Sequence, residues 1–243
     1  MRQALGLLVF CVLASPLFAS TTLPTSLKPV TIIRQNEIVH VFTSAIDVNY
    51  NGIQEIGDRP ASWHIVDVST MTTQRTLEFR WAVVNANRPW LSAALDRMFI
   101  GVGDSVIAYS ATTQAYIGGV FMGPSSGIYF DDEAQELYSA HRTSFVESGV
   151  VHVYSLATQN VWDIPVGVNP QQIAGYTSTV GGRGVVVVNE GTFGQNDGSV
   201  FVVPKEGTGT VIPVGDTPNP PTNSALSISA TANELFTAPR FAA

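Results

Sequence analysis

Cysteine and charged side chains are scarce in this chain. Its single cysteine, Cys11, lies in an apolar N-terminal run, so beyond that run there is no thiol to form a disulfide, attack a substrate or ligate a metal. Charged residues make up 13% of the 243 residues, about half of the usual share. Glycine, proline and small polar residues take their place, and this mixture favours strands and tight turns over long helices.

Basic residues in particular are few. The chain has 12 lysines and arginines against 19 acidic residues, which gives a formal net charge of −7. Such a surface repels nucleic acid and anionic lipid, and it suits the binding of cations. We therefore expect no nucleic-acid partner and no stable membrane insertion. The expected partner is a protein, a glycan or a small molecule.

Residues 1–19 have the pattern of a signal peptide. Arg2 supplies a positive start, residues 4–13 form an apolar run, and Ala19 is a small residue suited to cleavage. The run is too short to cross a bilayer. We expect residues 20–243 to form one domain exported to the periplasm or the cell exterior. The alternative for the apolar run is a buried N-terminal strand.

The strongest pattern beyond the N-terminus is a repeated hairpin. Each copy has an alternating apolar strand, a short polar turn and a second strand. Thr-Thr-Gln, Ala-Thr-Gln or Gly-Thr-Gly is expected in the same turn of each copy. The four predicted hairpins are residues 65–79, 106–120, 151–167 and 200–215.

Two further short strands precede each hairpin, so that every unit has four strands. The nearer strands are expected at 39–44, 97–102, 136–140 and 185–189, and the farther ones at 30–33, 91–94, 128–130 and 172–176. The connectors between units are expected to contain Pro89, Pro124, Pro170 and Pro221. Four antiparallel strands every ~40–50 residues is the spacing of β-propeller blades.

The apolar runs favour a propeller over a β-sandwich, which also uses many short strands. Residues 185–188 are four consecutive valines, so a strand there is apolar on both faces and suits a position between two sheets. A single four-stranded sheet cannot bury both faces, whereas stacked blades bury them against each other. The predicted fold is an all-β propeller of four full blades and a partial blade at residues 225–236.

Two segments that close the predicted blades resemble a known repeat. Residues 162–170 (Trp-Asp-Ile-Pro-Val-Gly-Val-Asn-Pro) and 211–219 (Val-Ile-Pro-Val-Gly-Asp-Thr-Pro-Asn) are similar to the repeats of YVTN/YncE-like propellers, and residues 189–200 to a segment of their secreted bacterial members. The resemblance implies a propeller fold and export, and no catalytic residue. Such propellers usually have more blades, so we expect the chain to be a C-terminally truncated fragment with an incomplete ring. The alternatives are a blade shared between both ends of the chain and closure of the ring by a partner.

Residues 47–58 match the formula of a calcium-binding loop. Oxygen-bearing side chains stand at loop positions 1, 3 and 5, glycine at 6 and a carboxylate at 12, where Asp58 replaces the usual glutamate. Alternate residues can turn inward to supply the oxygens that calcium requires. A structural calcium ion is therefore expected, and the alternative is an ordinary Asn/Gly-rich loop. The expected ligands are Asp47, Asn49, Asn51, the Ile53 carbonyl, Glu55 and Asp58.

The calcium-binding loop joins the second and third strands of its unit, and the corresponding loops of later units are also long. In a propeller these loops gather on one face, and loops on a rigid scaffold are common binding sites. A tight turn at 196–198 is the alternative for one of them. The candidate contact residues are His141, Arg142, Phe145, Glu190, Phe193 and Asn196.

No catalytic constellation stands out in the sequence. Residues 123–127 fit the G-x-S-x-G formula, but that motif needs a following helix and a strand is predicted at 128–130. The four histidines have no metal-ligand spacing. The predicted function is an exported, non-enzymatic binding or scaffold module with calcium as a structural ion. The alternative is a catalytic propeller, a lyase or hydrolase, with its site at the central channel.

Overall fold

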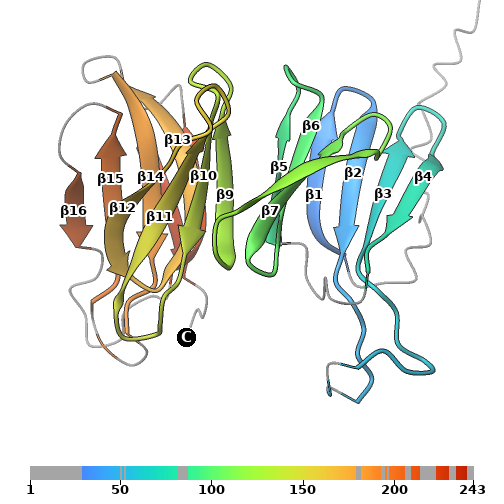
Figure 1. Cartoon of the computed structure of the whole chain (residues 1–243), viewed down its shortest axis with the longest axis horizontal. Helices are drawn as coiled ribbons and strands as arrows, with labels where there is room; N and C mark the ends of the chain where they lie inside the picture. The colour runs from blue at the N-terminus through green and yellow to red at the C-terminus, as the bar shows by residue number, and fades with distance from the viewer. Residues whose placement is uncertain are drawn as a thin grey trace, which may run out of the picture.

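A computed structural model shows a chain built from strands (Figure 1). It describes residues 29–49, 51, 53–80, 87–178, 182–192, 195, 197–205, 209–213, 223–229 and 234–239. The predicted signal peptide, Phe193, Asn196 and Pro221 lie outside these residues. Within the described ranges, no helix is long and apolar enough to span a membrane.

Four antiparallel four-stranded sheets follow one another along the chain, each with its strands in sequence order. Blade 1 is β1 (Pro29–Gln35), β2 (Ile38–Thr43), β3 (Ser62–Asp67) and β4 (Thr72–Glu78). Blade 2 is β5 (Asn87–Ser92), β6 (Arg97–Val102), β7 (Ser105–Ser110) and β8 (Tyr116–Phe121). Blade 3 is β9 (Ser125–Asp131), β10 (Glu136–His141), β11 (Ser148–Ser155) and β12 (Val161–Val168). Blade 4 is β13 (Pro170–Ser178), β14 (Gly182–Asn189), β15 (Ser199–Pro204) and β16 (Thr210–Pro213).

A two-stranded sheet follows blade 4, formed by β17 (Asn223–Ser229) and β18 (Glu234–Pro239). The prediction of four full blades and a partial one is therefore confirmed. The first strands of successive blades lie side by side, because β9 contacts both β5 and β13, and β13 also contacts β17. Figure 1 shows the sheets standing next to one another, with β4 and β16 at opposite sides of the view. The arrangement is that of propeller blades and not of a two-sheet sandwich.

The turn predicted in blade 1 is wrong by three residues. Thr72, Thr73 and Gln74 belong to β4, and the turn lies just before them. Asp67 explains the shift, because its Oδ1 accepts hydrogen bonds from the backbone N–H groups of Ser69 and Thr70 at 2.9 and 3.3 Å. This side-chain cap closes the chain before Thr72 is reached.

Two prolines also lie elsewhere than predicted. Pro89 is inside β5, at the irregularity between Asn87 and Trp90, and Pro170 is the first residue of β13. Both positions are ones where a strand tolerates a residue without a backbone N–H. The strand predicted at 91–94 accordingly begins earlier and ends at Ser92.

Each pair of neighbouring blades encloses its own apolar core. Strand β6 illustrates why, because Met98 and Ile100 pack toward Trp63 of blade 1, whereas Phe99 between them packs toward Phe130 of blade 3. Successive side chains of a strand point to opposite faces. A third core joins blades 3 and 4, and its fully buried members include Val151, Val153 and Val187. The fold therefore resembles a row of stacked units, each stabilised mainly by its neighbours.

An ion-pair cluster adds a polar link between blades 3 and 4. Arg183 of β14 pairs with Asp131 at 3.3 Å and with Glu133, and its side chain is 21% exposed. Tyr129 lies nearby on β9, and burial together with the charge of Asp131 raises its pKa to about 12. Tyr129 is therefore a neutral packing residue at physiological pH.

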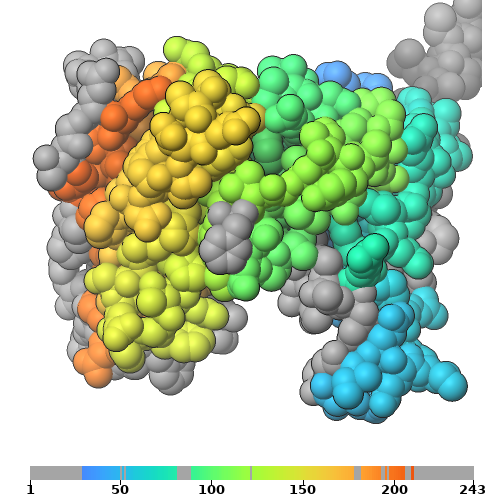
Figure 2. All heavy atoms as spheres, in the orientation of Figure 1, coloured from blue at the N-terminus to red at the C-terminus, as the bar shows by residue number. Residues whose placement is uncertain are grey.

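The antiparallel order places the loops between second and third strands on one face, together with the connectors between blades. We call this face the loop face; it is the lower edge of Figure 1. Residues 44–61 form the loop of blade 1, and Figure 2 shows this segment, in cyan, projecting beyond the rest of the molecule. At its tip Ile56 is fully exposed, and Val48 and Ile53 are more than half exposed.

Candidate functional site

A groove opens between blades 2 and 3 at the end opposite the loop face, and we call it the seam groove. Strand β8 forms one wall and is irregular there, because Tyr116 pairs with Tyr109 and Gly118 with Ala108, which leaves Ile117 as an extra residue. A β-bulge of this kind bends a strand and increases its twist. Gly118 has no side chain to fill the space, and a Cβ built there would meet no atom within 4 Å.

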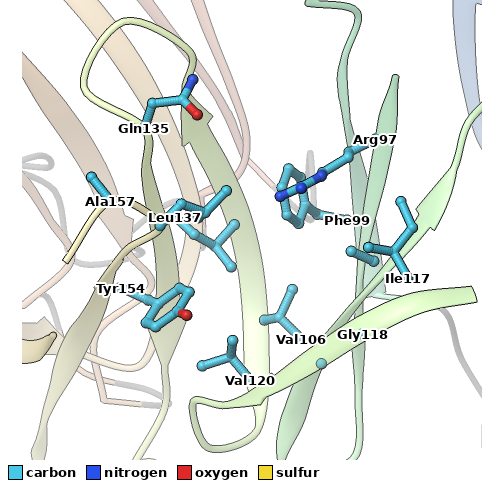
Figure 3. A pocket seen from close by; sticks show the side chains of 13 residues that line it. Arg97, Phe99, Val106, Ile117, Gly118, Val120, Gln135, Leu137, Tyr154 and Ala157 are labelled. Atoms are coloured by element: carbon cyan, nitrogen blue, oxygen red, sulfur yellow. The ribbon is translucent and has the colours of Figure 1, made fainter. Parts of the chain in front are cut away.

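The seam groove has a volume of about 420 Å³ and a mostly apolar lining. Phe99, Val106 and Ile117 come from blade 2, and Leu137 and Tyr154 from blade 3. Figure 3 shows these two sets facing each other across the space. Cavities of roughly 300–1,000 Å³ with an apolar lining and a few polar groups are typical of small-molecule sites.

Arg97 is the charged group of the seam groove. It begins β6 and is half-buried, and Figure 3 places it across the cavity from Gln135. Its guanidinium makes no ion pair or hydrogen bond with any residue that the structure describes. A half-buried arginine beside an apolar surface offers five N–H donors to an anionic group. The sequence analysis did not identify Arg97 as a site residue. What sets it apart from other arginines is its lack of a partner among the described residues, which is visible only in the folded structure.

The predicted contact residues lie on the loop face but do not form one cluster. Arg142 stacks on Phe145 with its Cζ 4.2 Å from the ring centre, and Phe145 is 58% exposed. Glu190 follows β14 and accepts a hydrogen bond from the side-chain amide of Asn169 at 2.8 Å. His141 ends β10 and points into a different cavity. Phe193 and Asn196 lie outside the described residues.

The predicted calcium ligands share the projecting loop, and most of their oxygens contact the loop itself. Asp58 accepts hydrogen bonds from the backbone N–H of Val48 at 2.8 Å and of Glu55 at 2.7 Å. Asn51 accepts one from Ile53 at 2.8 Å.

The two remaining carboxylates among the predicted calcium ligands also accept hydrogen bonds from the loop itself. Asp47 accepts hydrogen bonds from the backbone N–H of Asn49 at 3.1 Å and of Asn51 at 3.3 Å. Glu55 accepts a bond from the side chain of Asn49 at 2.6 Å. Within the described part of the chain, no group of three or more His, Cys, Asp or Glu side chains is arranged to hold a metal ion.

A second cavity lies in the same seam, on the loop face. His141 and His152 line it from blade 3, and Asp104 lines it from blade 2. The ring centres of the two histidines are 5.1 Å apart. The sequence analysis missed this pair, because the residues are not spaced as metal ligands along the chain. The pairing of β10 with β11 brings them together.

A third cavity lies between the first strands of the blades, which are the strands that border the central channel in a closed propeller. Trp90, Gln172 and Ile128 line it, and no titratable side chain does so among the described residues. The indole N–H of Trp90 and the amide oxygen of Gln172 are buried there without a hydrogen-bond partner in the described structure.

Comparison with known proteins supports the fold. No family model and no curated protein matches the sequence. The structure is similar to hydrazine synthase of Kuenenia stuttgartiensis, with 16% identity and a TM-score of 0.56, over 86% of this chain and 54% of that one. It is also similar to a chain of a mitotic checkpoint complex, with 11% identity and a TM-score of 0.50, over 89% of this chain and 73% of that one.

These similarities are to β-propeller proteins, and this chain spans about half the length of the hydrazine synthase chain. At such low identity they establish the fold and leave the activity open. The chain is therefore an all-β protein of propeller type, assembled from four-stranded antiparallel blades.

Proposed function

We propose that this protein is a non-enzymatic binding module, and that the seam groove takes a ligand with an apolar body and an anionic group. The observation that carries the proposal is Arg97, a half-buried arginine beside an apolar cavity of about 420 Å³ that pairs with no anionic group among the described residues. The lining of Phe99, Leu137 and Tyr154 suits a hydrocarbon or aromatic body. The guanidinium suits a carboxylate or sulfonate at its end.

The ligand class can be tested with 8-anilinonaphthalene-1-sulfonate, which combines an aromatic body with a sulfonate and fluoresces when bound to apolar surface. We expect Arg97→Gln to weaken its binding about 10-fold or more, because a charge-assisted hydrogen bond contributes about 1.5–3 kcal/mol. We expect Gly118→Leu to block the groove while leaving Arg97 in place, because the space beyond the Gly118 Cα is open.

Arg142→Gln is a matched control, since Arg142 is an exposed arginine of blade 3 that stacks on Phe145 outside the groove. Equal fluorescence of the wild type, Arg97→Gln and Gly118→Leu proteins would place the dye elsewhere and contradict the proposal. A neutral naphthalene analogue should bind the wild type and Arg97→Gln proteins equally, because it lacks the sulfonate.

Export and a structural calcium ion complete the proposed function. Residues 1–19 support export through their signal-peptide pattern. The loop at 47–58 supports calcium binding through the spacing of its oxygen-bearing side chains. A projecting loop that carries the exposed Val48, Ile53 and Ile56 would gain order from a bound ion. The resemblance to secreted YVTN/YncE-like propellers is in line with export.

A further inference from the structure

The cavity on the loop face of the seam between blades 2 and 3 is separate from the seam groove and has a volume of about 470 Å³. It carries two histidines whose placement follows from strand register. His141 pairs with Val150 across β10 and β11, and His152 pairs with Ser139, so the two histidines are diagonal neighbours on the blade face toward blade 2. Their rings are 5.1 Å apart between centres and are tilted by 44°.

Hydrogen bonds fix the tautomer of both imidazoles. Nδ1 of His141 lies 3.0 Å from the carbonyl oxygen of Pro124, and Nδ1 of His152 lies 2.6 Å from Oδ1 of Asp163. A carbonyl and a carboxylate can only accept, so each Nδ1 carries a hydrogen. Each neutral ring therefore has its free lone pair on Nε2. Metal-ligating histidines are held in this way, with one ring nitrogen donating to a carboxylate or a backbone carbonyl.

Two further features lie beside the histidine pair: a glycine that leaves room for both rings, and a buried hydroxyl without a hydrogen-bond partner among the described residues. Gly123 has a φ of +68°, and a Cβ there would lie 2.9 Å from Nδ1 of His141 and 3.3 Å from Nε2 of His152. Any larger residue would therefore crowd both rings. Ser139, opposite His152, is fully buried, and its hydroxyl has no hydrogen-bond partner in the described structure. Buried polar groups in folded proteins are nearly always hydrogen-bonded, so a hydroxyl without a described partner beside the two rings is in line with a bound water or ion.

We propose that His141 and His152 bind a divalent transition-metal ion of the zinc class through their Nε2 atoms, with Asp163 as a positioning residue. Imidazole nitrogen suits zinc, copper and nickel, whereas calcium prefers oxygen ligands. The site is therefore chemically distinct from the oxygen-rich loop at 47–58. Two protein ligands leave the other coordination positions to water, so the ion remains open to an exogenous ligand from the cavity.

Zinc titration of the full chain by calorimetry tests the site. We expect one zinc ion per chain, and at least a 10-fold loss of affinity in His141→Ala and in His152→Ala. Asp163→Asn should weaken binding about 10–100-fold although Asp163 is not a ligand, which is the usual effect of losing such a partner. Cobalt substitution gives a second readout, because nitrogen ligation changes its visible absorption and only the two histidine variants should lose that change.

His64→Ala is the matched control. His64 is partly buried on blade 1, and both of its ring nitrogens have protein partners, Ser62 at 2.8 Å and Thr76 at 3.0 Å. The His64→Ala variant should bind zinc as the wild type does, and so should the Asp47→Ala/Asp58→Ala double variant. The proposal is overturned if the folded wild type binds no zinc, or if the folded His141→Ala/His152→Ala double variant binds it with wild-type affinity. Far-UV circular dichroism establishes that each variant is folded.

Discussion

The core between blades 1 and 2 contains a histidine that must stay neutral. His40 is 1% exposed, and its Nδ1 accepts a hydrogen bond from the indole N–H of Trp63 at 3.2 Å. Its Nε2 lies 3.3 Å from Oε1 of Gln35, to which it donates. Burial lowers the pKa of His40 below its usual 6.5, although the charge of Asp96 acts in the opposite direction. Protonation would break the bond from Trp63 and bury a charge.

Because His40 is buried in its neutral form, we expect the protein to lose stability as the pH falls through about 6.5. The unfolded chain has the higher pKa and binds more protons between the two pKa values, so the free energy of unfolding rises with pH in that window. The stabilisation is present above the unfolded pKa and decreases below it. Urea denaturation at about pH 7 and about pH 5 should show the loss in the wild type and a smaller loss in His40→Gln.

His64 contributes with the same sign, because burial also lowers its pKa, against the effect of Glu78. The double variant His40→Gln/His64→Gln should therefore depend on pH less than either single variant. The carboxyls of Asp67 and Asp96, whose pKa values are lowered, act at more acid pH. A wild type and a His40→Gln protein with equal pH dependence would contradict the assignment.

At the scale of the element, calcium binding by the loop at 47–58 should increase the stability of the folded protein. An ion bound only by the folded state stabilises it by about 2.7 kcal/mol at a hundredfold excess over Kd, which is about 5–10 °C in Tm for a chain of this size. We expect calcium to raise the Tm of the wild type relative to chelator, and not that of Asp47→Ala/Asp58→Ala. Thermal unfolding followed by circular dichroism measures both.

The chelator comparison is needed because these carboxylates also hold the loop directly. Asp58 accepts bonds from the backbone N–H groups of Val48 and Glu55, so its loss destabilises the loop even without an ion. Asp58→Asn keeps one acceptor oxygen and is the conservative control. If the wild-type Tm is the same in calcium and in chelator, the loop is an ordinary polar turn.

The elements themselves were predictable from the sequence. In strands such as β6 and β10, apolar residues alternate with polar ones or form a continuous run over six residues between turn residues. An alternation with a period of two residues is a local signal that the sequence itself carries. The turn of blade 1 could not be placed from the sequence, because three threonines lie close together there. The hydrogen bonds accepted by Asp67 fix the position of the turn in the structure. Side-chain capping at one residue outweighed the similarity of the repeats.

Neither cavity of the seam between blades 2 and 3 could be predicted, because each depends on tertiary pairing. The seam groove requires the extra residue Ile117 in β8 and an Arg97 that pairs with none of the residues described after folding. The histidine pair requires the register of β10 on β11 across the loop at 142–147. Sequence spacing of 11 residues between His141 and His152 carries no such signal.

At the scale of the whole molecule, stability should be distributed over the seams between blades. Val186 and Val187 are adjacent on β14, are 5% and 0% exposed, and point to opposite faces of blade 4. Val187 packs in the core shared with blade 3, whereas Val186 belongs to the core on the other face, the side of blade 4 along which β17 lies. If the row of stacked units continues past blade 4, both valines are interior residues.

We therefore expect Val186→Ala and Val187→Ala to destabilise the protein by similar amounts, about 1–3 kcal/mol each, from two lost methyl groups and the cavity left behind. Chemical denaturation of the two variants measures this, and an unchanged m-value shows that the same unit unfolds. Thr73→Ala, at a solvent-exposed position of the outer strand β4, should change stability by less than about 0.5 kcal/mol. A near-neutral Val186→Ala beside a costly Val187→Ala would mean that blade 4 ends the stack in solution, with β17 and β18 not packed on it. Equal costs would mean that the partial blade covers the fourth as each full blade covers the one before it.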